Sequence, residues 1–328
     1  MSREIRLARR PAGEPVAGDF AVAEAEVRAP ADGELLVANT FMSVDPYMRH
    51  RMNASMVHMD PWPVGGTLDG AAVGQVLESR SPLWRPGDLV LHGLGWRERA
   101  VLPAADARPV PDPEIGASAY LGVLGLPGIT AWYALLRMGC FVPGETVFVS
   151  AAAGAVGSTV GQLVRHYGGT VIGSAGSPAK VTELVAGLGF DAAFCYRDAD
   201  SARELAALAP GGIDLYIDNV GGDQLAAALE ALRPHGRIVA CGMIAHANGD
   251  RPGPANLPLI VGKRLSMRGF IVSDHYDERP AFEREVVPLV RSGRLRAVQT
   301  VVSGLDRAPE ALIGLLRGDN TGKMVVAL

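Results

Sequence analysis

Small residues between positions 151 and 157 have the spacing of a phosphate-binding turn. The segment AAAGAVG places Ala152, Gly154 and Gly157 where the dinucleotide fingerprint G-x-G-x-x-G has its glycines. The second position lets the backbone approach a pyrophosphate, and the third lets a helix pack closely on its strand. The pattern predicts a pyrophosphate at a helix N-terminus. Close packing of small residues without any ligand is the alternative interpretation.

The residues expected near the ribose carry no carboxylate. An NAD site places an acidic residue about 20 positions after the fingerprint, but GSAGSPAK (173–180) contains none. Ser177 and Lys180 suit a 2′-phosphate instead, because an ammonium attracts that group and a carboxylate would repel it. This favours NADPH. Ser177 as a helix N-cap before Pro178 explains the same residues without a ligand, and both interpretations can hold together.

Alternating strands and helices must position these residues. TVFVS (146–150) and TVIGSA (170–175) are apolar runs typical of buried parallel strands, and helically spaced apolar residues lie between them. Further strands are predicted in the second half of the chain, which favours a doubly wound parallel sheet with helices on both faces, the Rossmann arrangement of the α/β class. They lie at 192–196, 213–220, 236–242 and 265–272.

The first 125 residues are different, because short apolar segments alternate there with Gly- and Pro-rich turns. Strands are predicted at 34–39 and 70–78, and the segment 85–91 is predicted to be a turn that leads into another strand. The C-terminal tail returns to this β-rich pattern around one helix at 307–317. We therefore predict a β-rich domain formed by 1–125 and 298–328, and a nucleotide-binding domain at 126–297.

Composition excludes several classes of partner. The 328 residues include 31 Lys and Arg against 35 Asp and Glu, a net charge of −4, which argues against a nucleic-acid-binding surface and favours small-molecule partners. No apolar run approaches the roughly 18 residues of a membrane span, and the N-terminus has no apolar signal segment. We expect a cytoplasmic protein.

Cysteines and histidines suggest no metal or redox site. Cys140, Cys195 and Cys241 lie far apart in apolar segments, so we expect neither a disulfide framework nor a C-x-x-C site, and inert buried thiols instead. Three histidines of the first domain lack a partner pattern and are predicted to be surface groups. These are His50, His58 and His92.

Six segments spread over almost the whole chain resemble one family. They are 39–52, 126–136, 151–162, 212–222, 236–244 and 314–326. With them the chain is similar to the zinc-independent medium-chain dehydrogenases/reductases, and within these to the leukotriene/prostaglandin, alkenal double-bond and curcumin reductases. The resemblance implies a GroES-like catalytic domain interrupted by a Rossmann domain, NADPH bound between the two, and a homodimer.

The resemblance also implies cofactor contacts. The 2′-phosphate contacts fall on Lys180, Tyr196 and Asn219, with Ser177 beside them. Asn219 with Gly221 and Gly222 could instead form only a strand-end turn, and Cys241 could be only a small core residue. The pyrophosphate loop comprises Ala153, Gly154, Ala155, Val156 and Gly157, and the nicotinamide side comprises Thr130, Cys241, the backbone of Phe270 to Val272, and Asn320.

Zinc-dependent relatives indicate which reaction to expect. They carry a GHE segment where this chain has GGTLDG (65–70), and a four-cysteine lobe that it lacks, so no metal is predicted. Hydride delivery to the β-carbon of an enone needs only enolate stabilisation and a proton. The expected activity is therefore NADPH-dependent reduction of the C=C bond of α,β-unsaturated ketones and aldehydes. A zinc-free quinone reductase and a non-catalytic NADPH-binding relative are the alternatives.

The proton donor differs from the family pattern. Family members commonly have a tyrosine where this chain has Ala247. The remaining candidates are Tyr47, His246, a ribose hydroxyl of the cofactor, and water. Tyr47 in SVDPYMR is the preferred side chain because Pro46 fixes the chain just before it, although the phenol could simply pack at a domain edge.

Overall fold

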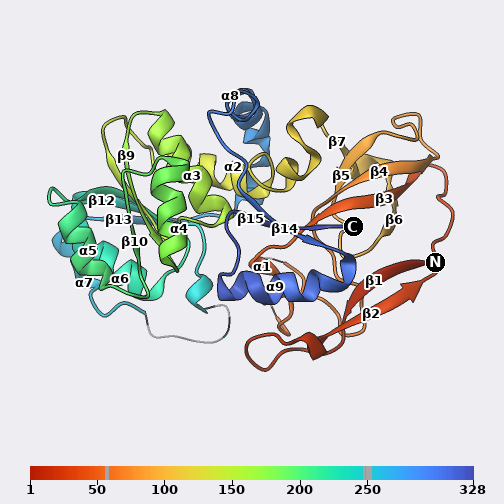
Figure 1. The fold of residues 1–328 in the computed structure, drawn as a ribbon, viewed down its shortest axis with the longest axis horizontal. Coiled ribbons are helices and arrows are strands. Elements are labelled where there is room, and N and C mark those ends of the chain that lie inside the picture. The colour runs from red at the N-terminus through yellow and green to blue at the C-terminus, as the bar shows by residue number, and fades with distance from the viewer. Residues whose placement is uncertain (56–58, 247, 249–252) are drawn as a thin grey trace. The chain divides into compact units, whose positions relative to one another are not determined.

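The computed structural model of the chain describes residues 1–55, 59–246, 248 and 253–328. These residues form two units, Met1–Leu121 with Gln299–Leu328, and Gly122–Val298. The C-terminal segment thus returns to the first unit, where its strand β15 (Lys323–Ala327) pairs with β3 (Glu34–Ser43) (Figure 1).

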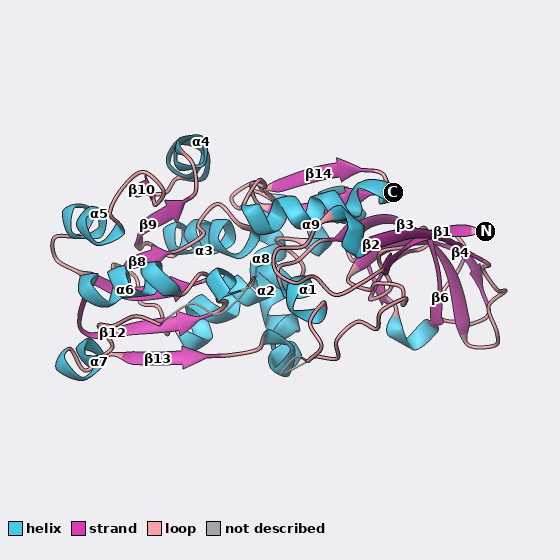
Figure 2. Cartoon of the chain, turned by 90° about the horizontal axis from the view of Figure 1, so that it is seen from below, coloured by secondary structure: helices cyan, strands magenta, loops and turns pink. Residues whose placement is uncertain are grey.

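A six-stranded parallel sheet forms the centre of the second unit. Its strand order is β10-β9-β8-β11-β12-β13, the order of a doubly wound sheet (Figure 2 shows β12 and β13 running side by side in the same direction). All residues of β11 are buried, as expected for a strand covered on both faces. The strands are β8 (Thr146–Val149), β9 (Thr170–Ala175), β10 (Ala192–Cys195), β11 (Ile213–Asp218), β12 (Leu232–Ala240) and β13 (Ser266–Gly269).

Helices cover both faces of this sheet (Figure 1). α2, α3 and α8 pack together on one face, and α5, α6 and α7 pack together on the other. Val160, Leu163 and Val164 of α3 are fully buried, which confirms the helical spacing predicted there. The helices are α2 (Leu126–Tyr133), α3 (Ala155–His166), α4 (Pro178–Thr182), α5 (Ser201–Leu208), α6 (Gly222–Ala231), α7 (Pro258–Gly262) and α8 (Arg279–Arg291).

The first unit is β-rich, as the sequence predicts. A seven-stranded sheet runs in the order β14-β15-β3-β4-β5-β7, with β6 paired to β3, and β1 and β2 form a separate antiparallel pair. Trp62 and Trp96 pack edge to face in its core. The remaining elements are β1 (Ser2–Leu7), β2 (Phe20–Ala25), α1 (Tyr47–Arg51), β4 (Ala72–Ser79), β5 (Leu89–His92), β6 (Arg99–Pro103), β7 (Arg108–Pro109), β14 (Gln299–Ser303) and α9 (Ala308–Arg317).

Two predictions about single residues are wrong. His92 is not a surface group: it is 6% exposed, because β5 lies inside the sheet between β4 and β7 and turns this side chain inward. Cys140 is not buried: it is exposed in a turn with a left-handed φ of 46°, and its Sγ contacts the Arg137 carbonyl. His58 lies outside the described residues.

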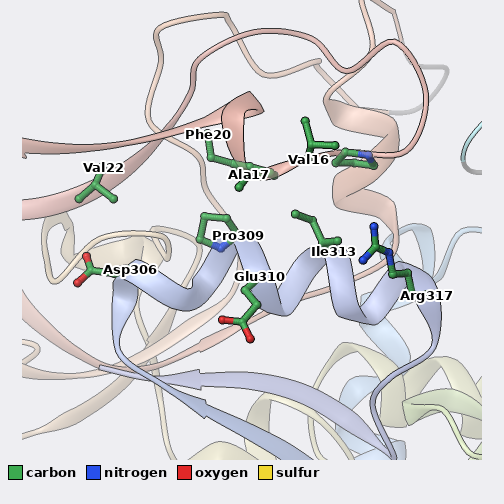
Figure 3. Close-up of a pocket in the computed structure, with 10 residues that line it drawn as sticks. Val16, Ala17, Phe20, Val22, Asp306, Pro309, Glu310, Ile313 and Arg317 are labelled. Carbon is green, nitrogen blue, oxygen red and sulfur yellow. The ribbon is translucent and has the colours of Figure 1, made fainter.

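A groove of about 470 Å³ opens on the surface of the first unit, between α9 and the segment that enters β2 (Figure 3). Val16, Phe20 and Ile313 make much of its wall apolar. None of the predicted site residues lines it. No helix in the described parts of the chain is long and apolar enough to cross a membrane.

Candidate functional site

Most of the predicted cofactor residues in the second unit lie at one edge of its sheet. Parallel strands all end at the same edge, and ligands of open α/β sheets bind beyond these carboxyl ends. Tertiary structure therefore brings together side chains that are far apart in sequence. The 153–157 turn follows β8, Ser177 follows β9, Tyr196 follows β10, Asn219 follows β11, Cys241 follows β12, and Phe270 and Val272 follow β13.

The N-terminus of α3 has the form of an anion site. Gly154 is its N-cap, with extended backbone angles (φ −79°, ψ 176°). Because glycine has no side chain, no side-chain group of the N-cap residue accepts a hydrogen bond from the first turn. In contrast, the side chains of Ser177 and Asp200 cap α4 and α5. The first N–H groups of a helix have no partner within the helix, so those of α3 can bind a phosphate.

Gly154 and Gly157 keep this turn tight. A Cβ on Gly154 would lie 3.1 Å from the carbonyl oxygen of Ala151. A Cβ on Gly157 would lie 2.5 Å from the same oxygen and 2.7 Å from the Cα of Ala152. Any larger residue at 157 would therefore push the helix away from the turn, which is the packing role predicted for the third glycine. The residues of the turn fit a bound pyrophosphate.

Polar and cationic groups gather where β9 and β10 end. Ser177 accepts a hydrogen bond from the Lys180 N–H, so the predicted N-cap is confirmed. A Cβ on Gly176 would lie 3.2 Å from the Tyr196 Oη and 3.6 Å from the Arg197 Nε, which places both side chains beside the end of β9. Tyr196 is 40% exposed, with the Arg197 guanidinium 5.9 Å from its ring centroid. These groups fit a phosphate monoester.

Arg197 was missed by the sequence reasoning. A basic residue directly after Tyr196 in FCYRD was the available signal, but only the structure places its guanidinium beside the end of β9.

Asn219 belongs to a buried network at the ends of β8 and β11. Its Nδ2 donates to the Ser150 carbonyl at 2.8 Å, and the Ser150 Oγ accepts the Asn219 N–H at 3.0 Å. Asp218, which is fully buried, accepts hydrogen bonds from the N–H groups of Val220 and Gly221 and from the Tyr216 hydroxyl. Asn219 thus forms the strand-end turn that was one of its two interpretations.

Cys241 follows β12 and is tied to the same network, because its N–H donates to the Asp218 carbonyl at 2.8 Å. Burial raises the pKa of its thiol, and the negative charge of Asp218 raises it further. The thiol therefore stays protonated and unreactive at neutral pH. The structure gives Cys241 a packing place at the sheet edge rather than the character of a nucleophile.

Thr130 and Phe270 have partners inside the second unit. Thr130, on α2, donates from its hydroxyl to the Leu126 carbonyl at 2.7 Å. The Phe270 ring lies 5.4 Å from the ring centroid of Tyr133, which in turn stacks on His275 at 4.4 Å. Val272 is 7% exposed. The side chains of 270 and 272 therefore pack into the protein.

Tyr47 and Asn320 belong to the first unit. Tyr47 begins α1 directly after Pro46 (φ −60°), and its ring packs against the core while remaining partly exposed. Asn320 is 6% exposed, and its Nδ2 donates to the Gly322 carbonyl at 2.6 Å. His246 ends a short 3-10 helix of the second unit and is half-buried. Ala247 lies outside the described residues.

A metal site is not apparent in the part of the chain that the structure describes. Within it, no three His, Cys, Asp or Glu side chains are grouped so that they could hold a metal ion.

Comparison with known proteins places these features in context. Residues 3–110 match a family model described as the N-terminal domain of oxidoreductase, and residues 155–290 match one described as zinc-binding dehydrogenase. The NADPH-dependent curcumin reductase of Escherichia coli (strain K12) is 38% identical over 99% of this chain and 96% of its own length. The NADP(+)-dependent 2-alkenal reductase of Nicotiana tabacum is 41% identical over 89% of this chain and 87% of its own.

Solved structures agree with these relatives. CurA from Vibrio vulnificus in complex with NADPH is similar to the chain with a TM-score of 0.94 and 36% identity, over 99% of this chain and 98% of that one. Two quinone oxidoreductases share the fold at 24% and 20% identity, a likeness that shows the fold alone.

Proposed function

We propose that this chain, which belongs to the zinc-independent medium-chain dehydrogenase/reductase superfamily, is an NADPH-dependent reductase of the C=C bond of α,β-unsaturated ketones and aldehydes. The observation that carries the proposal is the N-terminus of α3, where no side chain caps the helix and where only small residues fit in the preceding turn. The relatives support it, because they include an NADPH-dependent curcumin reductase and an NADP(+)-dependent 2-alkenal reductase. NADPH, when bound, supplies the hydride for the β-carbon of the substrate.

The residues of the second unit would hold this cofactor along the carboxyl edge of the sheet. The N–H groups at the start of α3 bind the pyrophosphate, with Gly154 and Gly157 keeping the approach open. Lys180, Ser177 and Tyr196 bind the 2′-phosphate, and Asn219 holds the adjoining turn in place. The nicotinamide contacts proposed from the family resemblance are Thr130, Cys241, the backbone of Phe270 to Val272, and Asn320.

Tyr47 is the side chain proposed to complete the reaction. Reduction at the β-carbon leaves an enolate, whose oxygen must be stabilised and whose α-carbon must gain a proton. The Tyr47 hydroxyl holds such a proton, and Pro46 and the core packing of the ring fix its direction. His246, a ribose hydroxyl of the cofactor and water are the other candidate proton donors, because this chain has Ala247 where the family commonly has a tyrosine.

The two units are proposed to act as a GroES-like catalytic domain, 1–125 with 298–328, and a Rossmann NADPH-binding domain, 126–297. Support comes from the strand orders of the two sheets and from the borders between the units at 121/122 and 298/299. A cytoplasmic location is proposed alongside, with the exposed free thiol of Cys140 suited to a reducing compartment.

A homodimer is proposed through the free edge of the parallel sheet. β13 is the last strand in the sheet order, and all four of its residues are exposed. Val261 (81% exposed), Met267 (37%) and Ile271 (39%) add apolar surface beside it. An exposed apolar edge is a template for pairing with another strand, and a second copy supplies the same edge under two-fold symmetry.

The activity is tested with purified protein by following NADPH consumption with a cyclic enone, a 2-alkenal and a benzoquinone, and by identifying the products by mass spectrometry. We expect the saturated ketone and aldehyde, with an enone turnover that survives dialysis against EDTA. An allylic alcohol as the product, or a quinone rate that exceeds the enone rate tenfold, would contradict the proposal. NADPH binding with no turnover of any substrate would favour a non-catalytic relative.

A further inference from the structure

A buried ion pair joins two distant segments of the first unit. The Lys323 Nζ lies 2.7 Å from the Asp45 Oδ1, with side-chain exposures of 3% and 8%. The same ammonium donates to the Val44 carbonyl at 2.5 Å, and the Ser43 hydroxyl donates to the other carboxylate oxygen of Asp45. Burial lowers the pKa of the Lys323 ammonium, and the charge of Asp45 opposes this shift.

Stability alone does not account for such a pair. Removing two charges from water costs about as much free energy as their attraction returns, and well-packed apolar residues of similar size are often as stable or more so. A buried pair does, however, hold its two segments in one arrangement, because a shift of either would leave an uncompensated charge in the interior. The question is therefore what the two segments carry.

The first segment leads into α1. Asp45 is followed by Pro46 and Tyr47, and its carbonyl accepts the N–H of Met48 at 3.1 Å in the first turn of the helix. The backbone is tied to β15 here as well, since the Val44 N–H donates to the Met324 carbonyl at 3.2 Å. A displacement of the Asp45 carboxylate would therefore move the start of the helix that bears Tyr47.

The second segment contains Asn320. Thr321, the residue after Asn320, is fixed to β14. The Thr321 N–H donates to the Thr300 hydroxyl, and the Thr321 carbonyl accepts from that hydroxyl, both at 2.9 Å. Lys323 fixes its other end. The 320–323 segment is thus held on both sides, with its Asn320 amide directed at the Gly322 carbonyl.

We propose that the Lys323–Asp45 ion pair is a positioning element that sets Tyr47 and Asn320 in one arrangement for reduction. The inference rests on the proposed function, which gives Tyr47 the proton and places Asn320 on the nicotinamide side. Both members of the pair act through these neighbours and not on the substrate.

The test compares the wild type with the apolar double variant Lys323→Met/Asp45→Leu, which removes both charges and so leaves neither unpaired. A matched control is Arg237→Met/Glu145→Leu, which removes a partly buried pair of the second unit whose atoms lie 2.5 Å apart. We expect the double variant to remain folded with unchanged NADPH affinity, and its kcat for an enone to fall about tenfold while KM changes less than threefold. The control should retain kcat.

A double-mutant cycle shows whether the pair acts through Tyr47. In a Tyr47→Phe background, removing the pair should lower kcat by a smaller factor than in the wild type, because residues that act together are not additive. Equal losses in both backgrounds, or wild-type kcat in the double variant, would overturn the proposal.

A spectroscopic readout keeps this inference separate from the activity. The chain has seven tyrosines, so ¹⁹F NMR of 3-fluorotyrosine-labelled protein resolves a small set of signals, and the one missing in Tyr47→Phe is assigned to Tyr47. In the double variant we expect this signal to shift or split while the other six stay in place. An unchanged Tyr47 signal would overturn the positioning role, whereas wild-type protein that reduces no enone would overturn only the proposed function.

Discussion

At the scale of one side chain, Lys180 is proposed to carry the preference for NADPH. It sits in the first turn of α4, near the end of β9 where Tyr196 and Arg197 lie. A charge-assisted hydrogen bond contributes roughly 1.5–3 kcal/mol, so Lys180→Ala should weaken NADPH binding about tenfold or more and NADH binding little. Fluorescence titration with both nucleotides measures this effect.

Arg197→Ala should act in the same direction and add to the effect of Lys180→Ala, because its guanidinium lies beside the end of β9, where the 2′-phosphate is proposed to bind. Arg203→Ala, an exposed arginine on α5, is the matched control and should change neither affinity. Equal affinity of the wild type for NADPH and NADH would refute the assigned preference.

Tyr47 is the residue on which the chemistry is proposed to depend. General-acid assistance is typically worth 10²–10⁴ in rate. With water and a ribose hydroxyl able to replace the phenol, we expect Tyr47→Phe to lower kcat about tenfold or less. Tyr276→Phe, which removes the hydroxyl of a 45% exposed tyrosine, is the control. A thousandfold loss of kcat with intact NADPH affinity would make Tyr47 the sole acid. An unchanged kcat would show that Tyr47 has only a structural role.

His92 should make the first unit sensitive to acid. Burial lowers its pKa from 6.5 to about 4, and the nearby Arg97 adds to this shift. Its Nδ1 accepts the Leu94 N–H at 3.1 Å, which also requires the neutral ring. The unfolded chain therefore takes up this proton before the folded one does. Above pH 6.5 this histidine does not lower the free energy of unfolding. Between pH 6.5 and about pH 4 it lowers that free energy by about 1.4 kcal/mol for each pH unit of acidification.

Urea unfolding of the wild type and His92→Gln at pH 7, 5.5 and 4.5 tests this expectation. The free energy of unfolding of the variant should fall less steeply with decreasing pH. Parallel curves for the two proteins would show that another group causes the acid sensitivity.

At the scale of elements, the approach of α3 to the β8 turn depends on Gly157. A Cβ at this position would overlap backbone atoms of Ala151 and Ala152, which cannot rotate away. We expect Gly157→Ala to cost about 1–3 kcal/mol of unfolding free energy and to weaken NADPH binding as the helix shifts. Thermal unfolding and nucleotide titration measure the two effects. Gly211→Ala, with no atom within 4 Å of the added Cβ, should change neither, and a Gly157→Ala variant that behaves like this control would contradict the packing argument.

Element boundaries were predicted well where the sequence signal was local. The strand predicted at 170–175 has those bounds, and the helix predicted at 307–317 runs from Ala308 to Arg317. The strand predicted at 236–242 instead begins at Leu232 and includes Pro234 and His235, which has a left-handed φ of 67°. A proline next to such a residue is typical of a turn, so its inclusion in a strand could not be predicted from propensity.

At the scale of the whole molecule, the free edge of β13 predicts that the protein is a homodimer. Val261→Asp/Met267→Asp would place charges where two copies are proposed to meet, and should convert a dimer into a monomer of 34.4 kDa. Light scattering after gel filtration measures the mass. Val185→Asp, a charge at a residue that is 41% exposed elsewhere in the second unit, should leave the dimer intact. A monomeric wild type would refute the proposed assembly.

The sequence by itself determined the class of fold, the turn at 152–157, and the missing acid after β9. Each of these is a local signal: apolar periodicity follows from the face that a segment buries, and glycine spacing follows from backbone geometry within a few residues. The same locality made the N-cap at Ser177 predictable. Resemblance to a family then extended these signals to an activity and a cofactor.

Only the tertiary structure decided which polar groups meet. Lys323 and Asp45 are 278 positions apart, and the Asn219 amide reaches Ser150 across 69 positions, because strand pairing brings those segments side by side. The burial of His92 likewise depends on the neighbours that β4 and β7 provide for β5. The sequence immediately around a polar residue can be the same on an exposed strand and on a covered strand. Its exposure and its partner are set by long-range packing, so no local pattern in the sequence could reveal them.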